Sequence, residues 1–206
     1  YLFKIEDKVE NKTQAPVVLD HRAYISRHGT PKIEGFIFMH EGFLGVPGEK
    51  GLQEIAYSDA LKKLKEGEQA SKTFEKSTGG WLGITDKYWA TALIPDQKAA
   101  YDAYVTGFNK LGARKEAYQV DYFLRNQVVA PGATQQVTSH FFAGAKRFDV
   151  IERYEAALSI KRFDQMVDWG YFHFFTKPLF RLLRWLHSIL GNFGLAILAV
   201  TVIVKL

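Results

Sequence analysis

The most informative absence in this 206-residue sequence is cysteine, which does not occur at all. Disulfides, thiolate zinc sites and cysteine nucleophiles are therefore excluded. The six histidines stand in no metal-ligand spacing such as His-Glu-x-x-His. The sequence also lacks a Gly-x-Ser-x-Gly elbow, and it places no two acidic residues where they would share a cleft. We therefore expect no metal, no cofactor and no enzymatic activity.

Charge of either sign is modest, with a net charge of +5 and a pI near 9.2. A mildly basic protein can meet nucleic acid or a membrane surface, and the position of the charge decides between them. Residues 1–145 show no arginine–aromatic stripe and no nucleic-acid motif, whereas basic residues accompany the apolar C-terminal region. We therefore expect lipid head groups, and not nucleic acid, to meet this charge.

A secretory signal is also missing from the start of the sequence. Tyr1 already lies within a strand pattern, and the other end stops one residue after Lys205, inside an apolar run. Both ends look cut, so we expect the sequence to be a fragment of a longer protein.

Residues 1–145 are dominated by strand patterns. The opening "YLFKIEDKV" mostly alternates apolar Tyr1, Phe3 and Ile5 with polar residues, which is the period of a half-buried antiparallel strand. Further strand candidates are "APVVLDHRAYISR", "GFIFMH", "LQEIAY", "GGWLGITDKYWATALIP", "AAYDAYVTGF", "EAYQVDYFLRNQVVA" and "TQQVTSHFFAG". Gly, Pro and Asn mark turns between them, so the pattern predicts an antiparallel β-sandwich.

Two stretches inside this zone need a separate interpretation. The lysine-rich segment 58–80 is either a short helix or a long strand with its loop. The glycines at Gly79, Gly80 and Gly83 do not make a phosphate loop. Because they flank Trp81, they favour close strand packing or a bulge.

After residue 145 the period becomes helical. In "KRFDVIERYEAALS" the apolar residues Phe148, Ile151, Tyr154 and Leu158 recur at helical spacing. The pattern predicts an amphipathic helix over 146–158 that packs on the edge of the sandwich. A linker to residue 165 follows it.

The segment "KPLFRLLRWLHSIL" predicts a second amphipathic helix, with Pro178 near its start and Gly191-Asn192 at its end. Lys177, Arg181, Arg184 and Ser188 form one polar stripe, and leucines fill most of the remaining circumference. Together with Trp185, this composition favours a helix lying in a membrane interface, with a core-facing helix whose arginines are solvated as the alternative.

Residues 193–204 are almost entirely apolar, but a membrane crossing needs roughly 20 residues. Because this run reaches the end of the sequence, we expect the start of a transmembrane helix. Lys205 comes roughly 18 Å along such a helix from Phe193, near the middle of a hydrocarbon layer about 30 Å thick. Either Lys205 faces water inside the bilayer, or it snorkels to the cytoplasmic surface.

Four motifs together resemble the YidC-type membrane protein insertases of the bacterial inner membrane. They are the Val-Asp-aromatic-Gly entry at 167–170, the "KPLF" helix start, the Gly-Asn-aromatic-Gly link at 191–194 and "GGWLGITDKYWATALIP" at 79–95. The resemblance implies a periplasmic β-sandwich similar to sugar mutarotases over 1–145, a helix and linker at 146–165, an interfacial region at 166–192 and a truncated transmembrane helix at 193–206. A mutarotase-like fold does not carry mutarotase activity with it.

The implied function is insertion and folding of nascent inner-membrane proteins, alone or with the Sec translocon and SecDF. The ribosome would bind through C-terminal regions that this sequence does not contain. Residues 1–170 would lie in the periplasm. The alternative is a membrane-tethered periplasmic sandwich that binds carbohydrate or peptide.

The resemblance also implies a substrate groove. In these insertases a positive residue, usually arginine, faces a hydrophilic groove, and Lys205 stands at that position. Thr201, one helical turn earlier, matches a threonine that matters in the family. Lysine keeps the charge but loses the planar fork of arginine. Lys177, Arg181, Arg184 and Trp185 are the expected membrane-interface residues.

Overall fold

The computed structural model describes residues 1–31, 39–65, 72–108, 116–170 and 173–205. The chain divides into two compact units, which we call the sandwich unit (Tyr1–Val167) and the helical unit (Asp168–Leu206). This division falls two residues after the boundary expected at residue 165.

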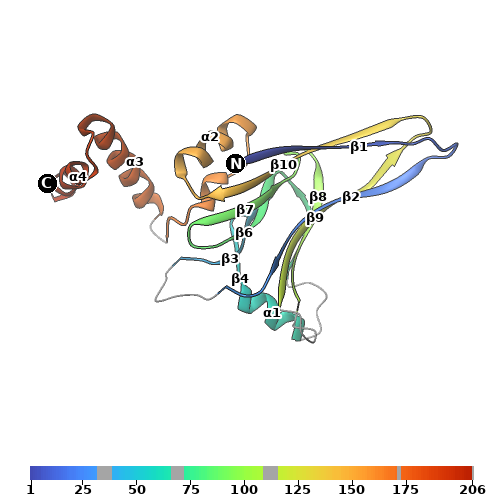
Figure 1. Cartoon of the computed structure of the whole chain (residues 1–206), viewed down its shortest axis with the longest axis horizontal. Coiled ribbons are helices and arrows are strands. Elements are labelled where there is room, and N and C mark those ends of the chain that lie inside the picture. The colour runs from blue at the N-terminus through green and yellow to red at the C-terminus, as the bar shows by residue number, and fades with distance from the viewer. Residues whose placement is uncertain (32–38, 66–71, 109–115, 171–172, 206) are drawn as a thin grey trace. The chain divides into compact units, whose positions relative to one another are not determined.

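The sandwich unit is built from two antiparallel sheets, as the turn-punctuated strand pattern predicted (Figure 1). Sheet A contains, in spatial order, β1 (Leu2–Glu10), β10 (Thr134–Ala145), β7 (Trp89–Ile94), β6 (Gly80–Thr85), β3 (Gly42–Pro47) and β4 (Gln53–Ala56). Sheet B contains β2 (Val17–His28), β9 (Ala117–Val129), β8 (Ala100–Phe108) and β5 (Lys72–Thr78). The prediction of a mainly antiparallel β fold is confirmed.

The strand period of two explains how the sheets meet. Along β9, Tyr118, Val120, Tyr122 and Leu124 are all buried, and they belong to a core between the two sheets. The residues between them point to the opposite face, because successive side chains alternate across a strand. Sheet B therefore has one buried face and one outer face.

The central strands of sheet A are covered on both faces. Every residue of β3 and β6 is buried. Phe43 of β3 packs in the core between the sheets, while its neighbour Leu44 packs in a second core on the other face. The second core is closed by α2 (Phe148–Leu158) and by η1, a 3₁₀ turn at Phe163–Met166. The sandwich unit thus has three layers around its central sheet.

The predicted helix over 146–158 is confirmed as α2, in which Phe148 and Ile151 are buried. It packs on a face of sheet A and not on the edge of the sandwich as expected, because Ile151 belongs to the second core. It ends at Ser159, whose backbone adopts a left-handed conformation (φ 52°) and whose N–H donates to the Glu155 carbonyl. Trp81 reaches the same layer from β6. Its indole packs edge-on against Phe163, with ring centroids 5.4 Å apart, and donates a hydrogen bond to the Arg162 carbonyl.

The lysine-rich segment holds both of the structures that were considered for it. It begins with α1 (Tyr57–Lys65) and ends with β5. A bulge interrupts the pairing of β5 with β8 between Phe74 and Ser77. The predicted strand "GFIFMH" falls mostly on residues outside the described ranges.

The first strand corrects a prediction. Its alternation correctly indicated β1, but the expected burial of one face was wrong, because Phe3, Ile5 and Val9 are all exposed. β1 is an edge strand that pairs only with β10, in an arm formed by the long strands (Figure 1). Apolar alternation reports which face would be buried, not whether another layer covers it.

The interpretation of the glycines beside Trp81 is confirmed. A Cβ atom on Gly80 would stand 1.8 Å from the Val46 carbonyl oxygen, and one on Gly83 would stand 2.0 Å from the Thr91 carbonyl oxygen. Gly80 also has φ 87°, which side chains other than glycine rarely adopt. These glycines allow the strands on either side of β6 to approach it closely.

The helical unit contains α3 (His173–Leu190) and α4 (Phe193–Lys205). Gly191 ends α3 with φ 64°, as predicted. Two details differ from expectation. First, α3 begins at His173, so Pro178 lies inside the helix and gives up one backbone hydrogen bond there. Second, Asn192 starts α4 as well as following α3, because its Oδ1 accepts from the Gly194 and Leu195 N–H groups.

Candidate functional site

The expected membrane-interface residues all lie on α3. Arg181, Arg184 and Trp185 are exposed, and Lys177 is half-buried. The spacing of Lys177, Arg181 and Arg184 puts them on one side of a continuous helix, so the polar stripe exists as a structural feature. Its contact with a membrane remains a prediction.

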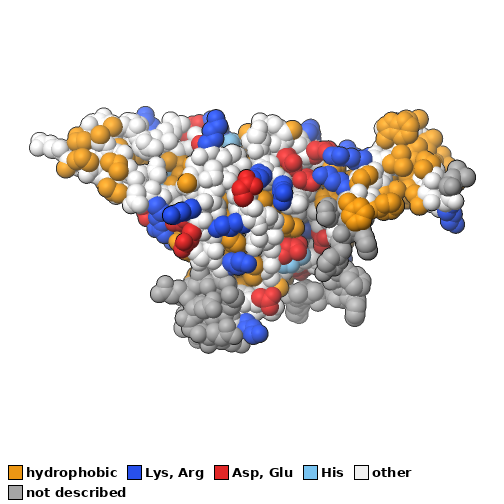
Figure 2. All heavy atoms as spheres, turned by 180° about the vertical axis from the view of Figure 1, so that it is seen from behind, with side chains coloured by type: hydrophobic (Ala, Val, Ile, Leu, Met, Phe, Trp, Pro, Cys, Tyr) orange, Lys and Arg blue, Asp and Glu red, His pale blue; other side chains and the backbone are white. Residues whose placement is uncertain are grey.

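Large apolar side chains are exposed along both helices of this unit. Figure 2 shows hydrophobic side chains gathered over it, at the right of the view. They include Phe174, Phe175, Trp185, Ile189, Leu190, Phe193, Leu195, Ile197, Leu198, Val202, Ile203 and Val204. Contiguous apolar surface of this kind marks a protein or membrane contact in a folded protein.

The expected groove residues lie on α4. Thr201 and Lys205 are exposed and four residues apart, so they share one face of the helix. The Thr201 hydroxyl donates to the Ile197 carbonyl at 2.8 Å. Among the described residues, no helix combines the length and the apolar character that a bilayer crossing requires. The groove itself therefore remains a prediction.

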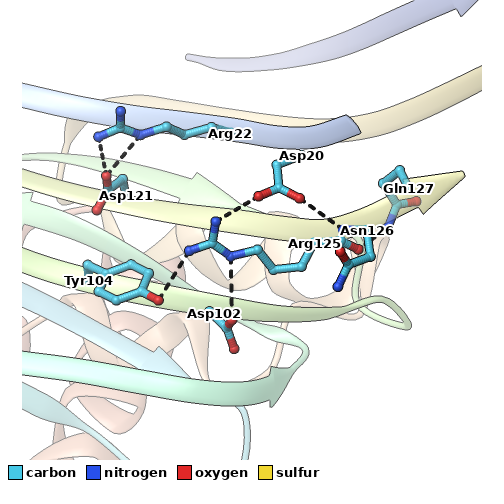
Figure 3. Close-up of polar contacts among 8 residues, drawn as sticks. All are labelled: Asp20, Arg22, Asp102, Tyr104, Asp121, Arg125, Asn126 and Gln127. Carbon is cyan, nitrogen blue, oxygen red and sulfur yellow. Dashed lines mark hydrogen bonds and ion pairs between the residues drawn. The ribbon is translucent and has the colours of Figure 1, made fainter. Parts of the chain in front are cut away.

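The outer face of sheet B carries a cluster that the sequence analysis missed. The expectation that residues 1–145 hold no arginine–aromatic stripe was wrong. Figure 3 shows the polar side chains of the cluster, which come from three neighbouring strands. We call it the outer-face cluster, and it consists of Asp20, Arg22, Asp102, Tyr104, Asp121, Phe123 and Arg125.

The strand register explains how the cluster forms. Phe123 of β9 stands opposite Arg22 of β2 on one side and Asp102 of β8 on the other. Two guanidinium groups lie over its ring, that of Arg22 at 4.9 Å and that of Arg125 at 4.1 Å from the centroid. Tyr104 packs edge-on against the same ring. Such cation–π stacking orders two arginines on a surface.

Each carboxylate of the cluster faces a guanidinium group. Asp121, which is only 4% exposed, accepts two hydrogen bonds from Arg22 through Oδ2, while its Oδ1 is buried without a partner. Arg125 donates to Asp20 at 2.7 Å and ion-pairs with Asp102 at 3.7 Å. The hydrogen bond from Arg125, with one from the Asn126 N–H, holds the pKa of Asp20 below its ordinary value.

Because its pKa is held low, Asp20 stays ionised at neutral pH and is a poor general acid. Arginine and tyrosine on an ordered surface are instead typical of contact sites. One sequence signal could have indicated half of the cluster. In "VDYFLR" the alternation puts Asp121, Phe123 and Arg125 on one strand face, but their partners come from strands about 20 and 100 residues earlier.

A cleft of about 940 Å³ opens between the sheets and α2. Its walls include apolar Ile84, Phe142 and Val150, and at its edge Arg27 donates to both carboxylate oxygens of Asp86 at 2.6 Å. Among the described residues, no group of histidine and acidic side chains is arranged to hold a metal ion.

The chain is similar over its whole length to three proteins named "Membrane protein insertase YidC". It is 45% identical to that of Beijerinckia indica, 46% to that of Methylobacterium nodulans and 42% to that of Rhizobium meliloti. It covers 33–34% of each relative, so it spans about a third of their length. A solved structure of a putative aldose 1-epimerase from Klebsiella pneumoniae matches 78% of this chain and 48% of that one at 12% identity, with a TM-score of 0.33.

A family model described as "YidC periplasmic domain" matches residues 1–182, which include the sandwich unit and the first half of α3. The matching relatives extend over the remainder of the chain as well. The resemblance drawn from the four sequence motifs is therefore confirmed, and the chain belongs to the YidC family, whose periplasmic domain it contains.

Proposed function

We propose that this chain is the part of a membrane protein insertase that joins its periplasmic domain to its membrane region. The observation that supports this best is full-length similarity, at 42–46% identity, to relatives named as YidC insertases. The substrates would be nascent inner-membrane proteins. The Sec translocon with SecDF would act beside it for some substrates, and any ribosome contact would fall to parts of the relatives that this chain does not span.

In this proposal the sandwich unit lies in the periplasm and the helical unit lies at and in the membrane. The sandwich unit stands in the periplasm, together with the chain to about residue 170, and serves in docking rather than in chemistry. The helix α3 lies in the outer membrane interface, with Lys177, Arg181 and Arg184 among the head groups. The helix α4 begins a crossing of the inner membrane. The exposed apolar surface of both helices supports this arrangement, because it lacks cover within the described part of the chain.

The positive charge of Lys205 is the feature on which the proposed insertion mechanism depends. A charge near the bilayer centre costs roughly 2.5–3.5 kcal/mol on insertion scales, so such a charge is kept where water or a polar partner meets it. We place it in a water-filled groove with Thr201 one turn away on the same helix face. There it draws acidic or polar parts of a translocated segment partway into the bilayer, which shortens the remaining crossing.

The test is an insertion assay in the full-length insertase with a substrate that carries acidic residues in its translocated tail. Because the mechanism needs charge and not a fork, Lys205→Arg keeps most of the activity, whereas Lys205→Ala and Lys205→Glu reduce it. Lys98→Glu is the matched control, since Lys98 is exposed on the sandwich unit. Full activity of Lys205→Glu, with a cysteine at position 205 closed to water-soluble reagents, would contradict the proposal.

The interfacial position of α3 has a separate test. Because the chain has no cysteine, single cysteines along 177–190 accept one spin label each. Depth in the bilayer should follow a wave with a period near 3.6 residues, and positions 181 and 184 should be the shallowest. Uniform exposure of all labels to water would exclude an interfacial helix.

A further inference from the structure

A second cleft of about 620 Å³ lies where the β3–β4 and β5–β6 turns meet the end of α2. Its lining residues are mostly polar, and lysine is the commonest charged type among them. The charged residues that line it are three lysines, Lys50, Lys76 and Lys161, and one glutamate, Glu49. We call it the lysine cleft. An excess of cationic side chains around a concave site favours an anionic ligand.

The ammonium groups of the lysine cleft are only partly neutralised. The Lys50 Nζ donates to the Glu75 carbonyl at 2.8 Å, which leaves its charge in place. Lys161 forms an ion pair with Glu49, but the Glu49 side chain is 90% exposed. The Lys161 side chain is 31% exposed. Because Glu49 is held on the solvent side of this pair, an incoming anion can replace its carboxylate at small cost.

A buried hydroxyl lies in the wall of the same cleft. Ser77 is 3% exposed, and its Oγ has no hydrogen-bond partner. A serine hydroxyl rotates freely and can donate to an anion, and a buried polar atom without a partner is unusual in a folded protein. Ser77 thus offers a neutral donor beside three cationic ones.

The backbone around the cleft is held in conformations that side chains rarely adopt. Lys76 (φ 48°) and Ser159 (φ 52°) line it in left-handed conformations, and Arg162 (φ 53°) follows Lys161. Residues held in this way tend to occur at binding sites. The outer-face cluster helps to fix Lys76, because Asp102, shown in Figure 3, accepts the Lys76 N–H at 2.9 Å as well as pairing with Arg125.

We propose that the lysine cleft binds the phosphate group of an anionic phospholipid head. The choice of a lipid over a free anion rests on the proposed function, because Lys161 precedes the amphipathic helix α3 by only twelve residues and α3 is placed among head groups. Lys76 and Lys161 supply the charge, and Ser77 supplies a hydrogen bond to a phosphate oxygen. The sandwich unit would then hold the membrane surface at a second point.

The experiment uses the full chain in phosphatidylcholine nanodiscs with ¹⁵N-labelled glycine. Gly79 lines the lysine cleft, and Gly132, in an exposed turn with open space around it, is the internal reference. Three soluble probes are titrated: dihexanoylphosphatidylglycerol, dihexanoylphosphatidylcholine and inorganic phosphate. We expect the Gly79 amide signal to shift saturably with the phosphatidylglycerol, at least tenfold more weakly with the phosphatidylcholine, and the Gly132 signal to stay in place.

Two substitutions and one control sharpen the result. Lys76→Gln and Lys161→Gln should each weaken the response at Gly79 about fivefold or more, while Lys8→Gln, an equal change of net charge on the exposed strand β1, should leave it unchanged. No change at Gly79 with phosphatidylglycerol, a response to inorganic phosphate without one to phosphatidylglycerol, or equal weakening by Lys8→Gln would each overturn the proposal.

The outcome separates this inference from the proposed function. If the lysine cleft does not bind the lipid head group, the Gly79 amide signal does not shift, while spin labels on α3 still show a periodic depth in the bilayer. If the interfacial placement of α3 fails, the depth wave is missing whatever Gly79 does.

Discussion

The two units of the chain carry similar apolar side chains, but the sandwich unit buries many of them and the helical unit leaves most of them exposed. Trp81 in the sandwich unit is 1% exposed and packs between sheet A and η1, whereas Trp185 in the helical unit is 59% exposed. In the first unit, apolar side chains stabilise the fold by packing on one another. In the second, the same side chains remain available to an apolar environment outside the unit. Hydrophobic content alone therefore does not tell which role a segment has.

The largest expected effect tests how closely the sandwich unit is packed. Gly80→Asn should cost more than about 3 kcal/mol or prevent folding, because its Cβ would meet the Val46 carbonyl at 1.8 Å. Gly132→Asn is the matched control, since Gly132 has φ 69° with nothing within 4 Å and asparagine tolerates that conformation. Denaturant melts of the full chain measure both. Equal stability of the two variants would mean that β3 and β6 are not held as closely as described.

The second effect compares the two tryptophans directly. Trp81→Ala should lower the free energy of unfolding by about 3–5 kcal/mol, because it leaves a cavity beside Phe163. Trp185→Ala should change it by no more than about 0.5 kcal/mol, and should instead weaken binding of the chain to lipid vesicles. If Trp185→Ala destabilised the sandwich unit as much as Trp81→Ala, the contrast between the units would fail.

A third effect compares two arginines. Arg22→Met should cost about 1–3 kcal/mol, because the buried Asp121 carboxylate loses both hydrogen bonds from Arg22 and keeps the one from the Gln119 amide. The double variant Arg22→Met with Asp121→Asn should recover part of this loss, which a general surface effect would not do. Arg184→Met on α3 should leave the melt of the sandwich unit unchanged and reduce affinity for anionic vesicles.

The smallest effect is a dependence of stability on pH. Burial, with a smaller contribution from Lys4 on the neighbouring strand, lowers the pKa of His140 from its ordinary 6.5. The unfolded chain then binds this proton more readily than the folded chain does, so stability falls as pH drops below about 6.5. His140→Gln should remove this part of the decline in melts between pH 8 and pH 5. Identical pH profiles for the two proteins would contradict it.

Features that depend on neighbours along the chain could be predicted from the sequence, and features that depend on contacts between distant segments could not. The period of two gave the strands, and the period near 3.6 gave α2 and α3, because both report neighbours along the chain. The exposure of β1 could not be predicted, because whether a second layer covers a strand depends on tertiary packing and not on the strand's own sequence. The outer-face cluster was missed for the same reason, because Arg22 and Phe123 meet only through strand pairing. For Thr201 and Lys205 the sequence supplied the helix and the shared face, while their groove stays a prediction.

The three-layer construction of the sandwich unit also has a consequence in time. The strands are complete once Ala145 has been made, but the far face of sheet A gains its cover only from α2 and η1, which ends at Met166. Synthesis proceeds from the N-terminus. One apolar face of sheet A therefore stays uncovered until residues 146–166 have been made. The first residue of α3 follows Met166 by only seven positions. Synthesis of α3, which we propose to lie in the membrane interface, thus begins almost as soon as the sandwich unit is complete.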